Sequence, residues 1–341
     1  MSYNIPMIHF DSNETRAGFY LAAEEYIMGN IRPDEPVLML WSVDPTVVIG
    51  ANQIAKVECD LEYMKDENIE LIRRPSGGGA IYTDREGLKF TIIMKYESGE
   101  DAKSFVQNWL AGPVLDTVAH FGADAVFGGR NDLLLAGKKF SGVSQYIRNG
   151  YVCSHGTLIF NTNLDCLERV LTVDQKKIET KAIASVRSRV TNITEHIEEK
   201  NLSKFREVLV DCYEKQMLLK GLAPLIRKEF TLNELKEIEI IVQEKYYNPE
   251  WTIGRDPAFT FRNKKRFPGG SIEVFLDVKG GVIRSAKIAG DFLALRPVTE
   301  LEEGLLGVQH TKNELEVALK KLDITSILGS LTEEELLETL L

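Results

Sequence analysis

The stretch that most constrains the fold is residues 88–95, in which two sets of side chains alternate. One set comprises Leu88, Phe90, Ile92 and Met94, and the other Lys89, Thr91, Ile93 and Lys95. Successive side chains of a β-strand point to opposite faces, so this alternation predicts a half-buried strand. The fold must therefore include a sheet with at least one buried face.

Other segments predict the strands and helices around this one. The expected strands are residues 37–41, 46–49, 69–72, 132–136, 140–147 and 151–160, and the expected helices are residues 15–29, 61–67, 101–121 and 203–219. Arg148, Asn149 and Gly150 predict a hairpin turn between the last two strands. This mixture predicts an α+β fold, with a mixed or antiparallel sheet flanked by helices.

A second, smaller α+β unit follows in the sequence. Residues 272–278 alternate as a strand does, Gly280-Gly281 offers a two-residue hairpin turn, and residues 282–288 return. Asn248-Pro249 is a breaker pair, so we predict a large domain at residues 1–248 and an accessory domain at residues 249–341. Three pairs have the spacing of a helix capping box, namely Thr231 with Glu234, Thr311 with Glu314, and Thr332 with Glu335.

The composition excludes several classes of protein. The 341 residues carry a formal net charge of −10, which is not the basic surface of a nucleic-acid binder. The four cysteines form no CxxC pair and the five histidines do not cluster beside them, so we expect neither a zinc site nor disulfides. No apolar run is long enough to span a membrane and no signal-peptide pattern is present, so we expect a cytoplasmic protein without a membrane partner.

The segment Arg73–Asp84, RRPSGGGAIYTD, has the composition of an anion cradle. Glycine lets backbone N–H groups approach a ligand closely, and a run of such groups forms an anion-binding concavity. Arg73 and Arg74 add planar donors that suit phosphate or carboxylate. The alternative is a flexible turn beside a surface arginine pair. The spacing is neither that of a P-loop nor that of a dinucleotide fingerprint.

The segment Gly129–Tyr146, GRNDLLLAGKKFSGVSQY, brings acidic and basic groups to two neighbouring strands. Asp132 opens the first strand, and its carboxylate could hold Mg²⁺. On the second strand, regular alternation places Lys139 on one face with Ser141, which predicts a polar pocket wall. The alternative is that the two adjacent lysines form a solvated hairpin tip.

Two further segments carry candidate polar groups. In Ser154–Phe160, SHGTLIF, His155 shares a strand face with Cys153. Cys153 could serve as an acyl nucleophile, and the alternative is that His155 is structural. In Lys181–Ile193, KAIASVRSRVTNI, basic residues accompany small ones. That segment is either an interface for an acidic partner or a solvated loop.

In this order, the four segments resemble the signatures of the lipoate–protein ligase A family. The matching residues are Arg73–Asp84, Gly129–Asp132 with Lys139–Gly142, Ser154–Thr157 and Ser185–Asn192, within a resemblance that spans residues 17–330. It includes an accessory-domain signature at residues 251–261 and 270–291. The family fold resembles the catalytic domain of biotin protein ligases, whose GRGRR-type loop is absent here.

The resemblance implies an ATP-dependent lipoate–protein ligase. Such an enzyme activates lipoate to lipoyl-AMP and then transfers the lipoyl group to a lysine of a carrier, either a lipoyl domain of a 2-oxoacid dehydrogenase acyltransferase or a glycine-cleavage H or H-like protein. ATP and Mg²⁺ serve as co-substrate and metal, lipoate is the substrate, and no tightly bound prosthetic group is expected. We expect a monomer whose accessory domain moves between the two steps.

The resemblance also assigns roles to individual residues. Lys139 is the implied catalytic lysine, and Asp132 is the implied metal ligand. The implied nucleotide-binding residues are Arg74, Gly77, Gly78, Gly79, Ala80, Ile81, Tyr82, Asn131, Asp132 and Lys139. The implied lipoate-binding residues are Trp41, Arg74, Ser76, Gly79, Lys139, Gly142, His155 and Gly156.

Several positions depart from the family pattern. Tyr20 replaces an asparagine, Ala51 a basic residue, and Thr83 and Ser154 each a histidine. Asn52-Gln53-Ile54 also replaces the usual ending in Q-N. Two alternatives therefore stay open. One is an acyltransferase that moves lipoyl or octanoyl groups between carriers without ATP, and the other is a protein that binds lipoyl-adenylate without modifying a carrier.

Overall fold

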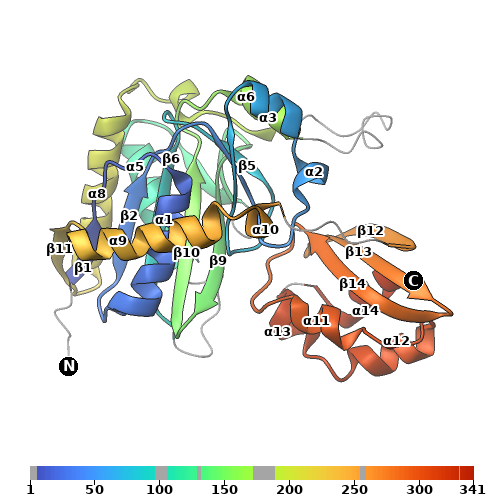
Figure 1. The fold of residues 1–341 in the computed structure, drawn as a ribbon. Coiled ribbons are helices and arrows are strands. Elements are labelled where there is room, and N and C mark those ends of the chain that lie inside the picture. The colour runs from blue at the N-terminus through green and yellow to red at the C-terminus, as the bar shows by residue number, and fades with distance from the viewer. Residues whose placement is uncertain (1–5, 97–105, 129–131, 172–188, 254–258, 330) are drawn as a thin grey trace. The chain divides into compact units, whose positions relative to one another are not determined.

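An eight-stranded sheet forms the centre of the larger part of the chain (Figure 1). The strand order is β11 (Ala223–Lys228), β1 (Pro6–Phe10), β2 (Val37–Trp41), β6 (Leu88–Lys95), β10 (Tyr151–Leu158), β9 (Lys138–Arg148), β8 (Asp132–Leu135) and β7 (Ala125–Gly128). The neighbours β11, β1 and β2 are parallel, and every pair from β2 to β7 is antiparallel. The sheet is therefore mixed, as predicted. The computed structural model describes residues 6–96, 106–128, 132–171, 189–253, 259–329 and 331–341.

The chain separates into two compact units. The first comprises residues 1–47, 60–72 and 81–248, and the second comprises residues 48–59, 73–80 and 249–341. The second unit thus takes in two short segments from the first quarter of the chain. The division into domains at residues 1–248 and 249–341 stays a prediction.

Helices cover both faces of the eight-stranded sheet (Figure 1). α5 (Gly112–His120) and α8 (Leu202–Leu219) pack on one face, and α1 (Ala17–Tyr26) covers the other, with α9 (Leu232–Ile241) packed on α1. The shorter helical segments of this unit are Ile27–Ile31, α3 (Leu61–Asp66), Val106–Ala111, α6 (Leu164–Val170), Ile193–Glu195 and Val242–Tyr246. The predicted helices are thereby confirmed, except that residues 101–105 lie outside the described part of the chain.

Strand β6 is buried on both faces over its first six residues, so the prediction of a half-buried strand is wrong. Leu88, Phe90 and Ile92 pack with residues of α5 and α8 in the main apolar core. On the other face, Lys89 and Thr91 are also buried, and Thr91 donates a hydrogen bond to Glu24 of α1, which covers this face. A polar face predicts contact with water, and only the three-dimensional structure shows that a helix lies over it.

Both predicted hairpin turns are confirmed. Asn149 and Gly150 have φ values of +53° and +78° between β9 and β10. Gly280 and Gly281 have φ values of +60° and +77° between β13 and β14. Two consecutive residues with positive φ give the tight turn whose twist matches that of the flanking strands.

The remaining strands form two small sheets. One contains β4 (Glu70–Arg73), β3 (Thr46–Ile49) and β5 (Ile81–Thr83) in that order. The other is the antiparallel sheet β12 (Phe261–Phe267), β13 (Gly270–Lys279) and β14 (Val282–Gly290). The second unit also holds α2 (Ala55–Glu58), α10 (Pro249–Thr252), α11 (Thr299–Gly304), α12 (Lys312–Leu319), α13 (Ile324–Leu328) and α14 (Glu333–Leu340). Its C-terminal sheet and helices enclose a separate apolar core, which confirms the smaller α+β unit.

Two of the three predicted capping boxes form. Thr231 and Thr332 each accept a hydrogen bond from the backbone N–H three residues on, and the partner glutamates bond back. The prediction for Thr311 is wrong, because this residue begins α12 without a capping hydrogen bond from its side chain. Spacing alone does not fix the rotamer on which the cap depends.

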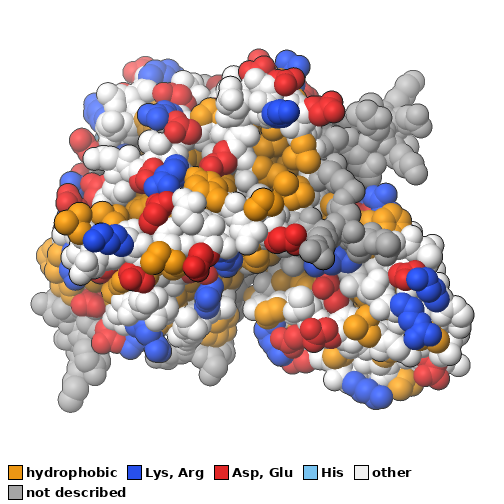
Figure 2. Space-filling model, in the orientation of Figure 1, with side chains coloured by type: hydrophobic (Ala, Val, Ile, Leu, Met, Phe, Trp, Pro, Cys, Tyr) orange, Lys and Arg blue, Asp and Glu red, His pale blue; other side chains and the backbone are white. Residues whose placement is uncertain are grey.

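Acidic and basic side chains are interspersed over the face of the molecule in Figure 2. Charges of both signs are thus spread over the surface in this view. In the part of the chain that the structure describes, no helix combines the length and the apolar character needed to cross a bilayer.

Candidate active site

One row of residues crosses five strands of the eight-stranded sheet, on the face that α1 covers. The paired positions are Trp41–Lys89, Lys89–Thr157, Thr157–Gly142 and Gly142–Asp132. Residues paired in register project from the same face of a sheet. The row therefore brings Trp41, predicted to bind lipoate, onto one surface with Gly142 and Asp132.

A β-bulge turns Lys139 onto this same face. Leu133 pairs with Ser141 and Leu134 pairs with Lys139, so Phe140 is an extra residue on β9. Regular alternation would give Lys139 and Ser141 one face, and the extra residue separates them. The prediction that these two residues share a pocket wall is therefore wrong. Ser141 is fully buried on the side of the apolar core, opposite Lys139.

Lys139 forms an ion pair with Asp132 above Gly142. Its Nζ lies 2.7 Å from Asp132 Oδ1, and the two side chains are 39% and 34% exposed. A Cβ placed on Gly142 would lie 2.7 Å from Nζ, so the missing side chain makes room for the lysine. The pair is thus neither a free hairpin tip nor a buried bridge, because both groups keep access to water.

Two residues of the fourth sequence segment run beside this lysine. Val190 bridges to Lys139, and the Thr191 N–H donates to the Lys139 carbonyl oxygen at 3.0 Å. The structure thereby brings together the second and fourth segments. Asn131, predicted to bind nucleotide, and residues 181–188 lie outside the described part of the chain.

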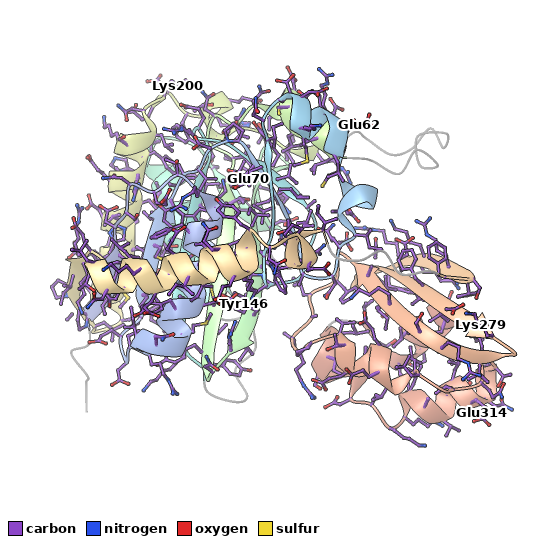
Figure 3. The ribbon with its side chains drawn as sticks, in the orientation of Figure 1. Glu62, Glu70, Tyr146, Lys200, Lys279 and Glu314 are labelled. Atoms are coloured by element: carbon purple, nitrogen blue, oxygen red, sulfur yellow. The ribbon has the colours of Figure 1, made fainter. Side chains whose placement is uncertain are left out.

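Glu24 ties α1 to the sheet. Its fully buried carboxylate lies 3.0 Å from His155 Nδ1 and accepts hydrogen bonds from Thr91 Oγ1 at 2.8 Å and Tyr146 OH at 3.3 Å. Tyr146 projects from β9 (Figure 3), and Trp41 Nε1 donates to Thr91 Oγ1 at 3.1 Å. His155 is therefore engaged with a carboxylate, and its predicted contact with lipoate stays a prediction. The sequence signal for Glu24 is its place in a helix whose neighbours are otherwise mostly apolar.

Two departures from the family pattern have visible consequences. Tyr20 stacks on Trp41, with ring centroids 4.8 Å apart and planes at 12°, and its hydroxyl donates to the Glu14 carbonyl oxygen at 2.8 Å. Ser154 is fully buried, and its hydroxyl accepts a hydrogen bond from Gln145 Nε2 at 2.7 Å. One face of the predicted lipoate wall is thus covered by a second aromatic ring.

Gly156 serves the core rather than the open surface. A Cβ placed there would lie 2.4 Å from Phe90 Cζ, on the strand that pairs with it. The fully buried Phe90 ring therefore occupies the space that any larger residue would need. The predicted contact of Gly156 with lipoate stays a prediction, and its packing role is independent of it.

Lys89 is a candidate site residue that the motifs did not indicate. It stands between Trp41 and Thr157 in the row and is only 3% exposed. Burial lowers the pKa of Lys89 to about 7, and the nearby Asp84 carboxylate opposes this shift only in part. The available signal was its position on the polar set of the alternating strand.

In the second unit, the triple glycine is held by close backbone approaches. Gly78 has a φ of +89°, a conformation that favours glycine. A Cβ on Gly50 would lie 2.2 Å from the Gly78 carbonyl oxygen, and a Cβ on Gly77 would lie 2.5 Å from that of Phe292. The Gly78 N–H donates to the same Phe292 oxygen at 3.2 Å. A Cβ placed on Gly79, by contrast, would lie 3.9 Å from Asp291 Cβ, an ordinary van der Waals contact.

Both arginines of this segment are buried inside it. Arg74 donates through Nη2 to the carbonyl oxygens of Gly77 and Gly79, at 2.7 and 2.8 Å, and through Nε to Ser76 Oγ at 3.1 Å. Arg73 donates to the carbonyl oxygens of residues 50, 51, 53, 251 and 252. Burial lowers the pKa of each guanidinium to about 10. The arginines thus shape the bend, and the predicted contact of Arg74 with the adenylate stays a prediction.

The other predicted nucleotide residues follow the bend. Ala80 and Ile81 are half-buried, and Tyr82 is buried on β5. Thr83, which stands where the family has histidine, is buried, and its hydroxyl has no hydrogen-bond partner among the described residues. The predicted nucleotide contacts of Ala80, Ile81 and Tyr82 stay predictions.

Asp132 suits a magnesium ion. It offers hard carboxylate oxygens, is one-third exposed, and faces an ammonium rather than a second acid. Mg²⁺ in nucleotide sites is held through one or two carboxylates together with substrate phosphates, and a single aspartate meets that pattern. Glu24, Cys153 and His155 also place possible ligand atoms within 4.8 Å of one another. There the carboxylate is already hydrogen bonded, and burial raises the pKa of the Cys153 thiol, which opposes metal binding.

The sequence matches two known protein domains. Residues 16–214 match the lipoyl protein ligase A/B catalytic domain, and residues 256–340 match the bacterial lipoate protein ligase C-terminus. A lipoate-protein ligase of Bacillus subtilis (strain 168) is 34% identical over 319 residues, which are 93% of this chain and 95% of that protein.

Two solved structures agree with the match. A lipoate-protein ligase A bound with ATP is 25% identical at a TM-score of 0.64, and covers 73% of this chain and 99% of its own. A bipartite lipoate protein ligase of Thermoplasma acidophilum, described with its E2 lipoyl domain, is 27% identical at a TM-score of 0.65 and covers 76% of this chain and 100% of its own.

The fold and the matched domains define an enzyme of the lipoyl ligase class. More closely, the chain belongs to the lipoate–protein ligase family. The family predicted from the four motifs is confirmed, and so is the predicted ligase activity.

Proposed function

We propose that this protein activates lipoate with ATP to form lipoyl-AMP, and then transfers the lipoyl group to a carrier lysine. The observation that carries the proposal is the bulge on β9, which sets Lys139 beside Asp132 on the face that also presents Trp41. The ATP-bound ligase among the similar structures supports the use of ATP.

The first step joins two anions. A carboxylate oxygen of lipoate attacks the α-phosphorus of ATP, and pyrophosphate leaves as the bond to it breaks. Because the reactants repel each other, the enzyme must supply oriented positive charge and N–H donors where their charges meet. We assign this role to the Lys139 ammonium, which the bulge sets beside Asp132. When bound, Mg²⁺ would add positive charge at the phosphates, held by Asp132.

The second step forms the amide. The carrier lysine amine attacks the acyl carbon of lipoyl-AMP, the bond to AMP breaks, and the amine loses a proton. The departing AMP carries the negative charge that Lys139 supported in the first step, so one cation serves both. Trp41, with Tyr20 stacked on it, is proposed to wall the apolar acyl chain.

The proposed partner is a lipoyl carrier domain. The archaeal ligase described with its E2 lipoyl domain supports this class of partner. We further propose that the protein acts in the cytoplasm as a monomer.

Transfer through a cysteine thioester is the less favoured mechanism. Cys153 is fully buried, and burial together with Glu24 raises the pKa of its thiol well above the usual value. A nucleophilic cysteine needs its thiolate and access to the acyl donor, and this residue has neither.

The test is the activity of Lys139→Ala beside that of Lys138→Ala. Loss of one preorganised cation should remove roughly 2.7–4 kcal/mol of transition-state stabilisation, or about 10²–10³ in turnover. Lys138 is the exposed neighbour and should be replaceable without loss. Pyrophosphate release with ATP, Mg²⁺ and lipoate reports the first step, and the intact mass of a lipoyl domain reports the second. Normal turnover in Lys139→Ala would refute the role of Lys139. If the wild-type protein forms the adenylate but modifies no carrier, the lipoyl-adenylate-binding alternative is favoured.

A further inference from the structure

Lys89 is a buried lysine whose charge could be paired by the proposed substrate. The residue is buried on the central strand of the sheet, at 3% exposure. Among the residues that the structure describes, none forms a hydrogen bond or an ion pair with its ammonium. A buried ammonium without a partner is strongly unfavourable, so such a group is kept neutral or is paired by something that binds.

The acidic groups around this face are already engaged. Asp132 pairs with Lys139, and Glu24 accepts from Thr91 and Tyr146 while facing His155. Asp84, the acid that acts on Lys89, accepts hydrogen bonds from the backbone N–H groups of residues 86 and 163. The protein itself therefore leaves no carboxylate committed to this lysine within its described residues.

The place of Lys89 in the row indicates which anion would pair with its ammonium. On one side its strand pairs with β2 at Trp41, about 5 Å away between backbones. On the other side, Gly142 and Lys139 lie on β9, two strands away, roughly 10 Å across the sheet. An acyl chain against Trp41 with its head group turned toward Lys139 would bring a carboxylate over Lys89.

We propose that Lys89 binds the carboxylate of the acyl substrate and presents it toward Lys139 before activation. The assignment rests on the proposed function, because it takes the substrate to be a free acid. A pKa near neutrality supports it: an amine that is partly charged before binding becomes fully charged when an anion arrives, since an opposite charge favours the ammonium form. The carboxylate would satisfy the ammonium, and the ammonium would draw in free acids rather than neutral analogues.

The experiment compares a charged probe with its neutral counterpart. Calorimetry would measure the affinities of lipoate and of lipoamide for the wild-type protein and for Lys89→Met, which keeps the stem and removes the charge. We expect lipoate binding to weaken roughly 10- to 100-fold in the variant, as for loss of a charged hydrogen bond, with lipoamide binding unchanged. Lys95→Met is the matched control, because Lys95 lies on the same strand but is exposed and paired with Asp34.

Two outcomes would overturn the assignment. One is equal affinity of Lys89→Met and wild type for lipoate, and the other is an equal loss for lipoate and lipoamide, which would mean a packing defect. Thermal unfolding of the variant separates such a defect from loss of charge.

Transfer from preformed lipoyl-adenylate keeps this inference distinct from the proposed function. Lipoyl-adenylate no longer has a free carboxylate. The Lys89→Met variant should therefore transfer the lipoyl group from the adenylate to a lipoyl domain at close to the wild-type rate. A transfer defect as large as the loss of lipoate affinity would overturn the role. If the wild-type protein binds lipoate but never ligates it, only the proposed function is refuted. The comparison of lipoate with lipoamide would still report on Lys89.

Discussion

Lys89 and Lys139 show how the surroundings of a side chain set its chemistry. Both are lysines on adjacent parts of one sheet face, yet Lys139 is 39% exposed and paired with a carboxylate, whereas Lys89 is buried. Burial disfavours the charged form, and it lowers the pKa of Lys89 to about 7. The residue type alone does not distinguish these two environments.

The lowered pKa predicts a pH-dependent stability. In the unfolded chain Lys89 titrates near 10.5, and in the folded protein near 7. Between these values the unfolded state binds more protons, so the unfolding free energy of the wild type rises with pH. Lys89→Met lacks this contribution. The stability advantage of Lys89→Met over the wild type should be largest below about pH 7. It should shrink as pH rises, by at most about 1.4 kcal/mol per pH unit.

Denaturant unfolding at a series of pH values measures this difference. Lys95→Met is again the control, because an exposed lysine that is charged in both states adds no slope between about pH 7 and pH 9. A Lys89→Met advantage that stays constant with pH would show that the wild-type lysine is not buried as a charge.

At the scale of elements, the bulge on β9 decides which residue faces the site. Strand positions alternate by two, and one inserted residue reverses the facing of all that follow. Phe140 takes this place, and it keeps its own ring in the apolar core while Lys139 turns to the other face. Gly142 completes the arrangement, since it leaves the space into which the lysine extends.

Gly142→Ala should therefore lower activity without unfolding the protein. The added Cβ would meet Cε and Nζ of Lys139 at 2.7 Å, and the flexible end of that side chain can move aside. We expect pyrophosphate release to fall at least tenfold, or about 1.4 kcal/mol, with a change in unfolding free energy of about 1 kcal/mol or less.

A double-mutant cycle tests the cause. In a Lys139→Ala background there is no ammonium to displace, so Gly142→Ala should have no further effect on turnover. Additive losses would mean that Gly142 acts on something other than Lys139.

At the scale of the whole molecule, the glycine bend depends on residues from the far end of the sequence. Gly77 and Gly78 touch the backbone at Phe292, and Arg73 donates to the carbonyl oxygens of Trp251 and Thr252. Within the second unit, the bend is therefore held by residues more than 170 positions away in the sequence. Removing those contacts should loosen the bend whatever the rest of the protein does.

Gly77→Ala and Gly79→Ala test this dependence as a pair. At Gly77 the new Cβ would lie 2.5 Å from the Phe292 carbonyl oxygen and 3.1 Å from Ala294 N, both backbone atoms. We expect this variant to lose roughly 1–3 kcal/mol of stability and to expose the Gly78 amide to faster hydrogen exchange. At Gly79 the new Cβ would make an ordinary van der Waals contact, so stability and exchange should stay near wild type. Equal effects of the two substitutions would contradict the structure.

Local patterns predicted much of this fold. The hairpin at Asn149-Gly150, the strand at residues 88–95 and the capping box at Thr231 each depend on neighbours within a few residues, so the sequence contains the whole cause. Less of the candidate active site could be predicted from the sequence. The positions of Lys139 and Asp132 could be identified from motifs, but the facing of Lys139 and the presence of Lys89 could not.

The sequence by itself determined the order of strands and helices, the tight turns and the family, because backbone preferences and alternating polarity are local properties. Only the tertiary structure decided that α1 covers the polar face of β6, that a bulge turns Lys139 away from Ser141, and that Lys89 is buried with no ion pair among the described residues. The physical reason is that burial and pairing depend on which distant segments meet, and the charge on a lysine follows from its surroundings rather than from its neighbours in the chain.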